Sequence, residues 1–433
     1  MAAQLDILSS EPVLYLNDFQ FHPHSFADDA GRLFLWNDEL YRAIDRSHAS
    51  FFTRLFDEGV IEQLTRRGLL INTELTGIRL DHYPMVVRHR RVAFVSYPNE
   101  WCAAMLKDAA LAIIDLSLQL AERKLTLKDA HPWNVLFDVN KPVYVDLTSI
   151  SQMTGETDWN AYDEFCRFCY YPLILMSQGH DRIARSLLPE FQGILRRELL
   201  TILRGSVPSR FTVSKLFDRI TRAIRSRVQT NQPEFFKRLH REVDKLRLPG
   251  EQQQSSNHAS DSTLTRSIVD RVLRELRPAN VIDLSRTAIW TSMMPASQGL
   301  TVVSINSDTG RAGALYRIAK ERDLPILPLL IDFIKPTPSV GYGNHYSIAA
   351  VDRLKCELVL ALGLVTEVAS NNHFSSDLIV EGLSSFSSRW VIVDFVSDRL
   401  KLFDFLKALQ RRFSCVTFLS SDGDQTALLL CEK

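Results

Sequence analysis

Three oxygen-bearing side chains in one short stretch of the chain have the spacing of a phosphoryl-transfer site. Asp129 is followed five residues later by Asn134, and Asp146 comes after a strand-like hairpin. Carboxylate and amide oxygens are ligands that Mg²⁺ takes, together with substrate phosphates. In this chemistry one Asp orients the acceptor hydroxyl and accepts its proton, whereas an Asn and a second Asp hold the metal. The spacing therefore predicts Asp129 as catalytic, and Asn134 and Asp146 as metal ligands.

The segment Leu127–Ser149 resembles the catalytic segment of the protein-kinase fold. The kinase pattern H-R-D-x-x-x-x-N followed by D-F-G has this spacing, with Lys128-Asp129 in place of R-D and Asp146-Leu147-Thr148 in place of D-F-G. The resemblance implies a Mg-ATP site. The alternative interpretation is a polar turn, in which the same side chains only cap backbone groups or end a strand.

Two parts that grip nucleotide phosphates in kinases have no clear counterpart upstream. The sequence before this segment contains neither a glycine-rich phosphate loop nor a V-A-I-K lysine. Arg42 stands where that lysine is expected, and Glu58 or Glu62 on the following helix is its expected partner. An arginine is a poor copy of the lysine, because its planar fork is larger and less adaptable. Arg42 is predicted to contact the nucleotide, with an ordinary surface-strand residue as the alternative.

The elements around this segment follow the order of a small mixed lobe, about 1–98, and a helical lobe, about 99–248. Two strand pairs are expected, the first joined by a turn at Asn37-Asp38. Their ranges are Gly31–Trp36 with Glu39–Ile44, and Tyr83–Arg88 with Arg91–Ser96. Apolar spacing predicts helices over Phe51–Leu70 and Cys102–Glu122, with a hinge at Tyr97–Glu100 before the second. From Leu147 to Leu246 the chain is expected to be mostly helical.

The C-terminal part alternates between short apolar runs and helical patterns, which predicts a mainly parallel sheet with helices on both faces. The polar segment Pro249–Thr263 is expected to be a linker, so that a second domain covers 264–433. Helices are expected at Thr263–Leu276 and Gly310–Arg322. Strands are expected at Asn280–Leu284, Thr301–Ile305, Leu327–Asp332, Leu358–Leu362 and Trp390–Phe395, followed by an antiparallel pair at Ser414–Leu419 and Thr426–Cys431.

The turn after the first of these strands has the position of a cofactor site. Rossmann-like sheets place glycines there for close approach, and an acid at the end of the second strand takes the ribose hydroxyls. Asp283 is present, but Ser285 and Ile289 stand at the glycine positions of the pattern D-L-G-x-x-x-G. A β-branched residue cannot take a positive φ cheaply. The other predicted cofactor contacts are Asn306 in the acid position, Asp308 as its substitute and Asp332 after the third strand. The alternative is a set of strand-end polar residues with no ligand.

Short matches along both parts of the chain carry a resemblance to one bacterial family. They are Ser96–Trp101, Met105–Leu111, Leu127–Ala130, Leu327–Leu329 with Asp332, Gly341–Asn344, Leu358–Leu362, Asn371-Asn372 and Asp394–Val396. On these residues the chain is similar to methyltransferase-like proteins with a kinase-like N-terminal segment, among them host-specific nodulation proteins. The resemblance implies a class I methyltransferase fold with S-adenosylmethionine as cofactor. Relatives with an intact site carry glycines in the first turn and a His-His pair after the fourth strand, where this chain has Thr366-Glu367.

Composition narrows the remaining classes of function. The 433 residues include 51 Lys and Arg against 51 Asp and Glu, and this zero net charge argues against a general binder of nucleic acid. No apolar run approaches the ~18 residues of a membrane span, and the N-terminus has no secretory-signal pattern. Six scattered cysteines suggest reduced thiols. A cytoplasmic protein without a membrane span is therefore expected.

Three functions remain open for a chain with this predicted fold class, an α+β kinase-like domain followed by an α/β Rossmann-like methyltransferase domain. The first is Mg-ATP-dependent phosphoryl transfer to a small molecule, glycan or peptide, beside a degenerate second domain. The second is S-adenosylmethionine-dependent methyl transfer to a small molecule or glycan. The third is a pseudoenzyme that acts as a scaffold or regulator for a protein partner.

Overall fold

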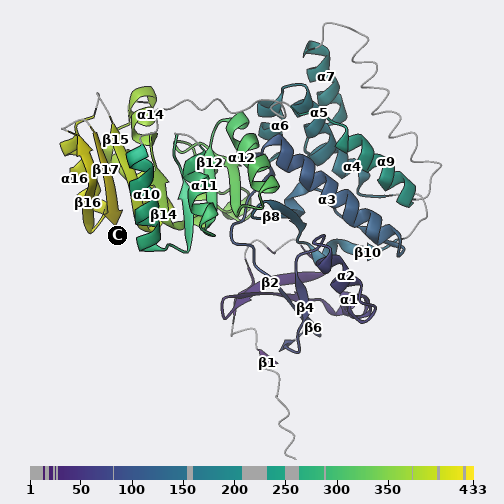
Figure 1. Ribbon diagram of the computed structural model, residues 1–433. Helices are drawn as coiled ribbons and strands as arrows, with labels where there is room; N and C mark the ends of the chain where they lie inside the picture. The colour runs from purple at the N-terminus through teal and green to yellow at the C-terminus, as the bar shows by residue number, and fades with distance from the viewer. Residues whose placement is uncertain are drawn as a thin grey trace, which may run out of the picture.

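The structure is a computed structural model that describes residues 13–14, 19–22, 25, 28–80, 82–153, 159–206, 232–248, 263–286, 289–372, 374–396, 400–422 and 426–433. Figure 1 shows a small sheet at the bottom, a group of helices at the upper right and a large sheet with its helices at the left. We call the described residues up to 248 the N-terminal region and those from 263 the C-terminal region. Apart from Thr263, the expected linker at 249–263 lies outside the described residues.

The small sheet contains four antiparallel strands in the order β2-β3-β6-β4. Their bounds are β2 Gly31–Trp36, β3 Glu39–Ile44, β6 Met85–His89 and β4 Thr73–Leu75. The predicted first hairpin is confirmed with its bounds, since Asn37 and Asp38 take positive φ values of 50° and 63°, as a type I′ turn requires. The predicted strand at Arg91–Ser96 is wrong, because β4 already occupies the second edge of β6. The short strands β1 Val13–Leu14 and β5 Arg79–Leu80 pair separately.

Two helices cover the range where one was predicted between these strand pairs. Helix α1 runs from Arg46 to Asp57 and α2 from Val60 to Arg66. Gly59 separates them with φ of +68°, a left-handed conformation that ends a helix and that side chains rarely adopt. A Cβ at this glycine would meet nothing within 4 Å, so the backbone conformation, not the available space, favours glycine here.

The helical part of the N-terminal region is built around the long buried helix α3. The predicted helix Cys102–Glu122 is confirmed within one residue at each end as α3 Ala103–Ala121, after a short 3₁₀ turn Pro98–Glu100. Helix α9 Gln232–Asp244 packs along α3. The other helices are α4 Tyr162–Phe165, α5 Tyr171–Ser177, α6 Asp181–Leu187 and α7 Arg196–Ser206, with a π-helical turn Cys166–Tyr170 between α4 and α5.

Two small antiparallel strand pairs follow α3 in the chain and precede α4. The loops that connect their strands carry the residues predicted to do chemistry. Strand β7 Leu125–Leu127 pairs with β10 Ile150–Gln152, and β8 Val135–Asp138 pairs with β9 Lys141–Tyr144. Asp129 and Asn134 therefore lie between β7 and β8, and Asp146 lies between β9 and β10.

The C-terminal region contains a seven-stranded sheet in the order β13-β12-β11-β14-β15-β17-β16. Strand β17 runs opposite to the other six, which are parallel to one another. This order and direction are those of the class I methyltransferase fold. All predicted strands of this part are confirmed within two or three residues at their ends. They are β11 Asn280–Asp283, β12 Thr301–Asn306, β13 Ile326–Leu330, β14 Cys356–Ala361, β15 Ser387–Val396, β16 Cys415–Asp422 and β17 Thr426–Glu432.

The helices of the C-terminal region connect these strands. They are α10 Thr263–Leu276, α11 Trp290–Ser297, α12 Thr309–Glu321, α13 Ala350–Arg353, α14 Leu364–Asn372, α15 Ser376–Phe386 and α16 Leu402–Arg412. The strand order reverses between β11 and β14. Open α/β sheets bind ligands in the crevice that such a reversal leaves beyond the carboxyl ends of the strands.

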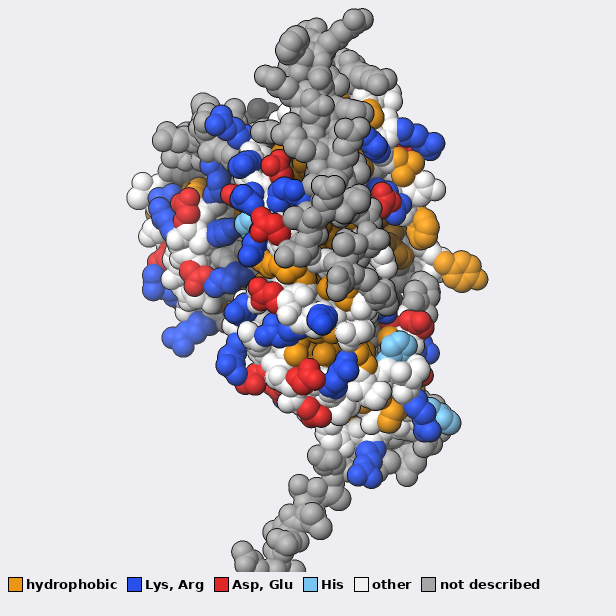
Figure 2. All heavy atoms as spheres, turned by 90° about the vertical axis from the view of Figure 1, so that its right-hand side faces the viewer, with side chains coloured by type: hydrophobic (Ala, Val, Ile, Leu, Met, Phe, Trp, Pro, Cys, Tyr) orange, Lys and Arg blue, Asp and Glu red, His pale blue; other side chains and the backbone are white. Residues whose placement is uncertain are grey.

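The described surface carries charges of both signs. On the face shown in Figure 2, basic and acidic side chains are interspersed over the described part of the molecule. Some of these side chains form ion pairs with a residue one or two helical turns away. Arg167 pairs with Asp163, and Arg241 pairs with Glu234. None of the helices in the described part of the chain is both long and apolar enough to cross a bilayer.

Candidate functional site

The three residues predicted from their spacing lie around two hydroxyl groups. The Tyr144 hydroxyl donates to the backbone carbonyl of Asp129 at 2.8 Å and lies 3.2 Å from Asn134 Nδ2, which donates to it. The Ser149 hydroxyl accepts the backbone N–H of Asp129 at 3.0 Å. Asp146 begins the 3₁₀ turn that ends at Ser149, and its carboxylate accepts from that turn. The loop after β7 and the turn after β9 are therefore fastened to each other by side chains.

Arg42 reaches this group from the small sheet. Its Nη1 donates to Asp28 Oδ2 and to Thr148 Oγ1, both at 2.5 Å, and lies 3.1 Å from Asp146 Oδ1. The Thr148 hydroxyl has one proton to share between Asp28 Oδ2 at 2.6 Å and Asp146 Oδ1 at 2.7 Å. The Arg42 side chain is 7% exposed, so its charge is compensated mainly by the partly exposed carboxylates of Asp28 and Asp146 and not by water. Arg42 is thus no surface-strand residue.

The prediction that Glu58 or Glu62 is the partner of Arg42 is wrong. Glu58 lies 4.0 Å from Arg54, and Glu62 pairs with Arg66 at 2.5 Å, both one helical turn away on exposed helix surfaces. The break at Gly59 accounts for part of this, since it changes the helix phase that the prediction assumed. Asp28 takes the partner's place from a loop that carries no recognisable motif.

The Asp129 carboxyl lies in a half-buried position among other charges. Burial raises its pKa, the neighbouring His131 lowers it, and the carboxylates of Asp146 and Asp28 raise it further. These influences show that the carboxyl groups of Asp129, Asp146 and Asp28 share one electrostatic environment. A carboxyl with a raised pKa holds a proton more readily than an exposed one.

Three buried nitrogens of the described residues near this site have no hydrogen-bond partner: Arg42 Nε, His89 Nε2 and His131 Nδ1. Arg42 and His89 point to the same face of the small sheet, because His89 lies two residues from Val87, the cross-strand partner of Arg42. His89 Nδ1 lies 2.8 Å from the Thr73 hydroxyl. Burial and the charge of Arg42 lower the pKa of His89 to about 3, so its ring is neutral. Such groups fit a place that a polar ligand completes, although the described part of the chain has others away from this site.

The donor set is that of a metal shared with phosphates. Among the described residues, no three His, Cys, Asp or Glu side chains lie close enough to hold a metal by themselves. Mg²⁺ is commonly bound by one or two carboxylates together with substrate phosphates and water. Asn134 uses its amide nitrogen on Tyr144, so its amide oxygen is the atom left for a metal. Asp146 Oδ1 is engaged by Thr148, which leaves Oδ2. These two oxygens are of the kind that magnesium takes together with a phosphate, and a metal site here stays a prediction.

At the ends of the C-terminal strands the predicted residues differ from those of the N-terminal site, because their polar atoms form hydrogen bonds with other groups of the protein. Asp283 is buried, and its carboxylate accepts the backbone N–H of Ser285 at 2.9 Å and the hydroxyls of Thr291 at 2.8 Å and Ser292. The Ser285 hydroxyl accepts the backbone N–H of Leu362 at 3.0 Å. The serine at the first glycine position therefore ties the turn after β11 to the end of β14. Thr287 and Ala288 of the same turn lie outside the described residues.

The Arg286 side chain lies across the ends of the strands, where a cofactor is expected. It is 9% exposed, its Nε is 3.0 Å from Glu367 Oε1 on α14, and its Nη1 donates to the Ile305 carbonyl of β12 at 3.3 Å. The sequence prediction missed this pair. A sequence signal for the pair exists: Arg286 in the first turn and Glu367 after the fourth strand carry opposite charges at positions that depart from the family pattern. The pair joins the first turn to α14 at the end of the sheet where the resemblance places the cofactor.

The remaining predicted cofactor contacts serve the local backbone. Asn306 Oδ1 accepts the backbone N–H of Asp308 at 2.8 Å, and Asp308 caps α12 by accepting from the Arg311 N–H at 2.9 Å. Asp332 accepts the backbone N–H of Ile334 at 3.0 Å and is exposed. These contacts are the ones expected for strand-end polar residues, and a role in binding a cofactor stays a prediction.

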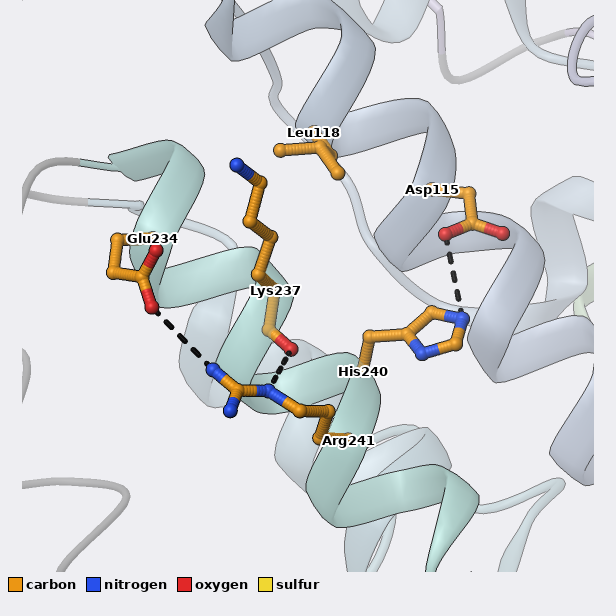
Figure 3. Close-up of a pocket in the computed structure, with 6 residues that line it drawn as sticks. All are labelled: Asp115, Leu118, Glu234, Lys237, His240 and Arg241. Carbon is orange, nitrogen blue, oxygen red and sulfur yellow. Dashed lines mark hydrogen bonds and ion pairs between the residues drawn. The ribbon is translucent and has the colours of Figure 1, made fainter.

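An open pocket of about 440 Å³ lies elsewhere, between α3 and α9. Figure 3 shows Asp115 and Leu118 of α3 facing four charged or polar side chains of α9. His240 Nε2 lies 3.5 Å from Asp115, and Arg241 pairs with Glu234. Only the contact of His240 with Asp115 crosses this pocket, and none of the residues predicted to do chemistry lines it.

Comparison with known proteins finds one distant curated relative for most of the chain. The nodulation protein NoeA of Rhizobium meliloti (strain 1021) is 22% identical over 398 residues, which cover 85% of this chain and 83% of NoeA. No protein-family model matches the chain. This similarity supports the resemblance to nodulation proteins as a distant one that spans both regions.

Solved structures with partial similarity include methyltransferases. The magnesium protoporphyrin IX methyltransferase ChlM of Synechocystis PCC 6803, solved with bound S-adenosylmethionine, is 18% identical, covers 54% of this chain and 96% of its own, and has a TM-score of 0.28. WbdD, a bifunctional kinase-methyltransferase, is 16% identical with a TM-score of 0.28, and the match covers 39% of this chain and 38% of WbdD. Superpositions at this level carry no argument about a site, so the assignment of the C-terminal fold rests on its strand order.

Proposed function

We propose that the N-terminal region is a kinase-like domain that binds a magnesium-bound nucleoside triphosphate and transfers its terminal phosphoryl group to a hydroxyl acceptor. The acceptor oxygen forms a bond to the terminal phosphorus, the bond from that phosphorus to the bridging oxygen breaks, and a nucleoside diphosphate leaves. The acceptor proton passes to the Asp129 carboxylate. The acceptor is a small molecule, glycan or peptide. In this proposal the domain covers residues 1–248, and a methyltransferase-like domain covers 264–433.

A single observation carries the proposal: Arg42, Asp129, Asn134 and Asp146 come from three separate segments, β3, the loop after β7 and the turn after β9, and lie together. Contacts through Tyr144, Thr148 and Ser149 join them, as given above. A polar turn would need only local contacts, whereas Arg42 crosses 106 positions in sequence to reach Thr148. Long-range convergence of this kind favours a site over the alternative of a capped turn.

The electrostatics suit the proposed roles. The raised pKa of Asp129 makes its carboxylate a better proton acceptor than an exposed one, which is useful for a general base. Asn134 and Asp146 would hold the magnesium ion, whose charge would offset that of the phosphates. Arg42 would contact the phosphates, in competition with Asp28, which now accepts from it at 2.5 Å.

The test is calorimetric titration of the full chain with ATP in the presence of Mg²⁺. We expect saturable binding that requires Mg²⁺, and we expect Asp146→Asn to weaken it at least about tenfold, because one metal ligand loses its charge. The matched control is Asp138→Asn, an acid on the same hairpin that pairs with Arg90 on the surface. Absence of binding by the wild-type chain with either Mg²⁺ or Mn²⁺, or equal effects of the two substitutions, would contradict the proposal.

A second candidate function, S-adenosylmethionine-dependent methyl transfer, is favoured by the strand order of the C-terminal sheet. It is opposed by Arg286, which lies in the crevice paired with Glu367, and by the turn that Ser285 ties to β14. We therefore propose that this domain is degenerate as an enzyme. Calorimetry with S-adenosylmethionine should give no heat of binding, and binding by the wild-type chain would make the second candidate the better one.

A further inference from the structure

Three segments that surround the proposed nucleotide site are each held by the C-terminal region. They are the segment 95–100, which includes the predicted hinge Tyr97–Glu100, the loop at 129–134 and the tip of the β8–β9 hairpin, which lies between Asn134 and Asp146. No contact of the degenerate cofactor crevice is involved. The contacts come instead from α12 and from the segment 346–353.

The hinge is held by Arg353, the last residue of α13. Its guanidinium pairs with Glu100, and Nη1 donates to the Val95 carbonyl at 2.6 Å. The exposed fractions of the two charged side chains are 3% and 1%, so this is a buried ion pair between the two regions. Glu100 uses its second oxygen to accept the backbone N–H of Tyr97 at 3.0 Å. The pair therefore fixes both ends of the hinge turn.

Aromatic side chains continue this contact to the loop that carries Asp129. The Arg353 guanidinium stacks on the ring of Tyr97 at 4.4 Å, and the Tyr97 hydroxyl accepts the backbone N–H of Ile348 at 2.9 Å. The ring of Trp133 lies 5.5 Å from that of Tyr97 and 5.6 Å from that of Tyr346. Trp133 thus packs between the hinge and the C-terminal region, and it is the residue next to Asn134 in the chain.

The hairpin tip is held by the end of α12. Asn140, which is buried, donates from Nδ2 to the carbonyls of Ala319 at 3.0 Å and Leu324 at 2.8 Å. The Tyr316 hydroxyl donates to Asp108 Oδ2 at 2.6 Å and lies 3.4 Å from the Asn140 carbonyl. Asn140 therefore joins the hairpin tip to the last turn of α12 and to Leu324 beyond it, and these contacts hold the hairpin between the two predicted metal ligands.

We propose that Arg353 is a positioning residue for the N-terminal site, and that the C-terminal region serves as a fixed support that holds the hinge and the loop at 129–134 in place. This inference rests on the proposed function for its effect on nucleotide affinity. Its structural half, the ordering of the loop by Arg353, is measurable without any nucleotide. A fold kept for this purpose needs its helices and the segment 346–353, but not an open cofactor crevice.

The test compares amide hydrogen exchange and Mg-ATP affinity in full-length Arg353→Met and Lys320→Met. Lys320 is the matched control, because it crosses the same interface to pair with Asp108 at 2.6 Å, but it touches none of the three segments. We expect faster exchange at 129–134 and about tenfold weaker Mg-ATP binding in Arg353→Met, as for a coupling between sites, and neither change in Lys320→Met. Arg353→Lys, which keeps the charge, should restore part of the affinity.

A second variant covers the case in which Arg353→Met does not fold. Glu100→Gln combined with Arg353→Met removes both buried charges and keeps an acceptor for the Tyr97 N–H. Unchanged exchange at 129–134 in either folded variant would overturn the positioning role. If exchange rises as expected while the wild-type chain binds no Mg-ATP, the positioning of the loop stands and the proposed phosphoryl transfer falls.

Discussion

The N-terminal site and the C-terminal crevice differ in where their polar groups find partners. Around Arg42 and Asp129 three buried nitrogens have no partner among the described residues, and the carboxylates of Asp28 and Asp146 lie nearby in partly exposed positions. Around Asp283 each acceptor is used by a hydroxyl or a backbone N–H, and Arg286 is paired with Glu367. A site that binds a polar ligand leaves groups for it, whereas a site that has lost its ligand is free to satisfy them internally.

The largest expected effect concerns Asp283 in the C-terminal region, for which we expect a structural role. Asp283→Ala should lower the free energy of unfolding by about 4 kcal/mol, because it leaves the hydroxyls of Thr291 and Ser292 and an N–H buried without their acceptor. Urea unfolding of the full chain measures this. A loss below about 1 kcal/mol would show that the carboxylate is not the organising group of the turn.

A second effect concerns acid and the N-terminal site. The pKa of His89 is lowered to about 3, so the unfolded chain takes up a proton near pH 6.5 that the folded chain refuses. The stability contributed by neutral His89 is present above pH 6.5 and is lost as the pH falls towards 3. Between pH 7 and pH 4.5 the loss should be about 2–3 kcal/mol. It should be absent from His89→Gln, and an equal acid sensitivity of that variant would remove His89 from the account.

The C-terminal region should show the opposite pH dependence. Burial raises the pKa of Asp394 to about 6, although its carboxylate accepts the Gly363 N–H at 2.7 Å. The folded chain therefore holds this proton below pH 6 while the unfolded chain releases it, and acidification from pH 7 to pH 4.5 should add about 2 kcal/mol of stability. Asp394→Asn should abolish that gain and be the more stable protein at pH 7. Unfolding curves at the two pH values decide this, and an undiminished gain in the variant would contradict it.

The smallest effect concerns Asp129 itself. Its pKa is raised by burial and by neighbouring carboxylates, so its ionised form costs stability at neutral pH. Asp129→Asn should therefore stabilise the chain by up to about 1 kcal/mol, as replacements in strained functional sites do, and should abolish phosphoryl transfer. Melting temperatures at pH 7.5 measure the first part. A clear loss of stability would indicate the structural, capped-turn interpretation of this residue.

Much of the fold followed from periodicity, and the failures have local causes. The hairpin at Asn37-Asp38 and the strands of the C-terminal sheet were predictable because turn chemistry and apolar alternation act over short distances. The strand at Arg91–Ser96 was not formed, because the three residues of β4 took its place beside β6. So short a strand leaves little pattern in a sequence.

The candidate site residues, like the strands, were predictable only where a local sequence pattern marks them. That Asp129, Asn134 and Asp146 lie near one another was predictable from the order of the segment that carries them, whereas their catalytic and metal-binding roles stay predictions. Asp28, which pairs with Arg42, lies in a loop without pattern, and nothing local marks it as a partner. The pairing of Arg286 with Glu367 joins positions 81 residues apart, so it needed the strand order to become visible.

The most direct test of the contrast is one thermal-shift experiment on the full chain with two ligands. Mg-ATP should raise the melting temperature of the wild-type chain and of Asp138→Asn equally and that of Asp146→Asn clearly less at the same ligand concentration, and S-adenosylmethionine should leave the wild type unchanged. A shift with S-adenosylmethionine and none with Mg-ATP would reverse the assignment of the two sites and contradict the account.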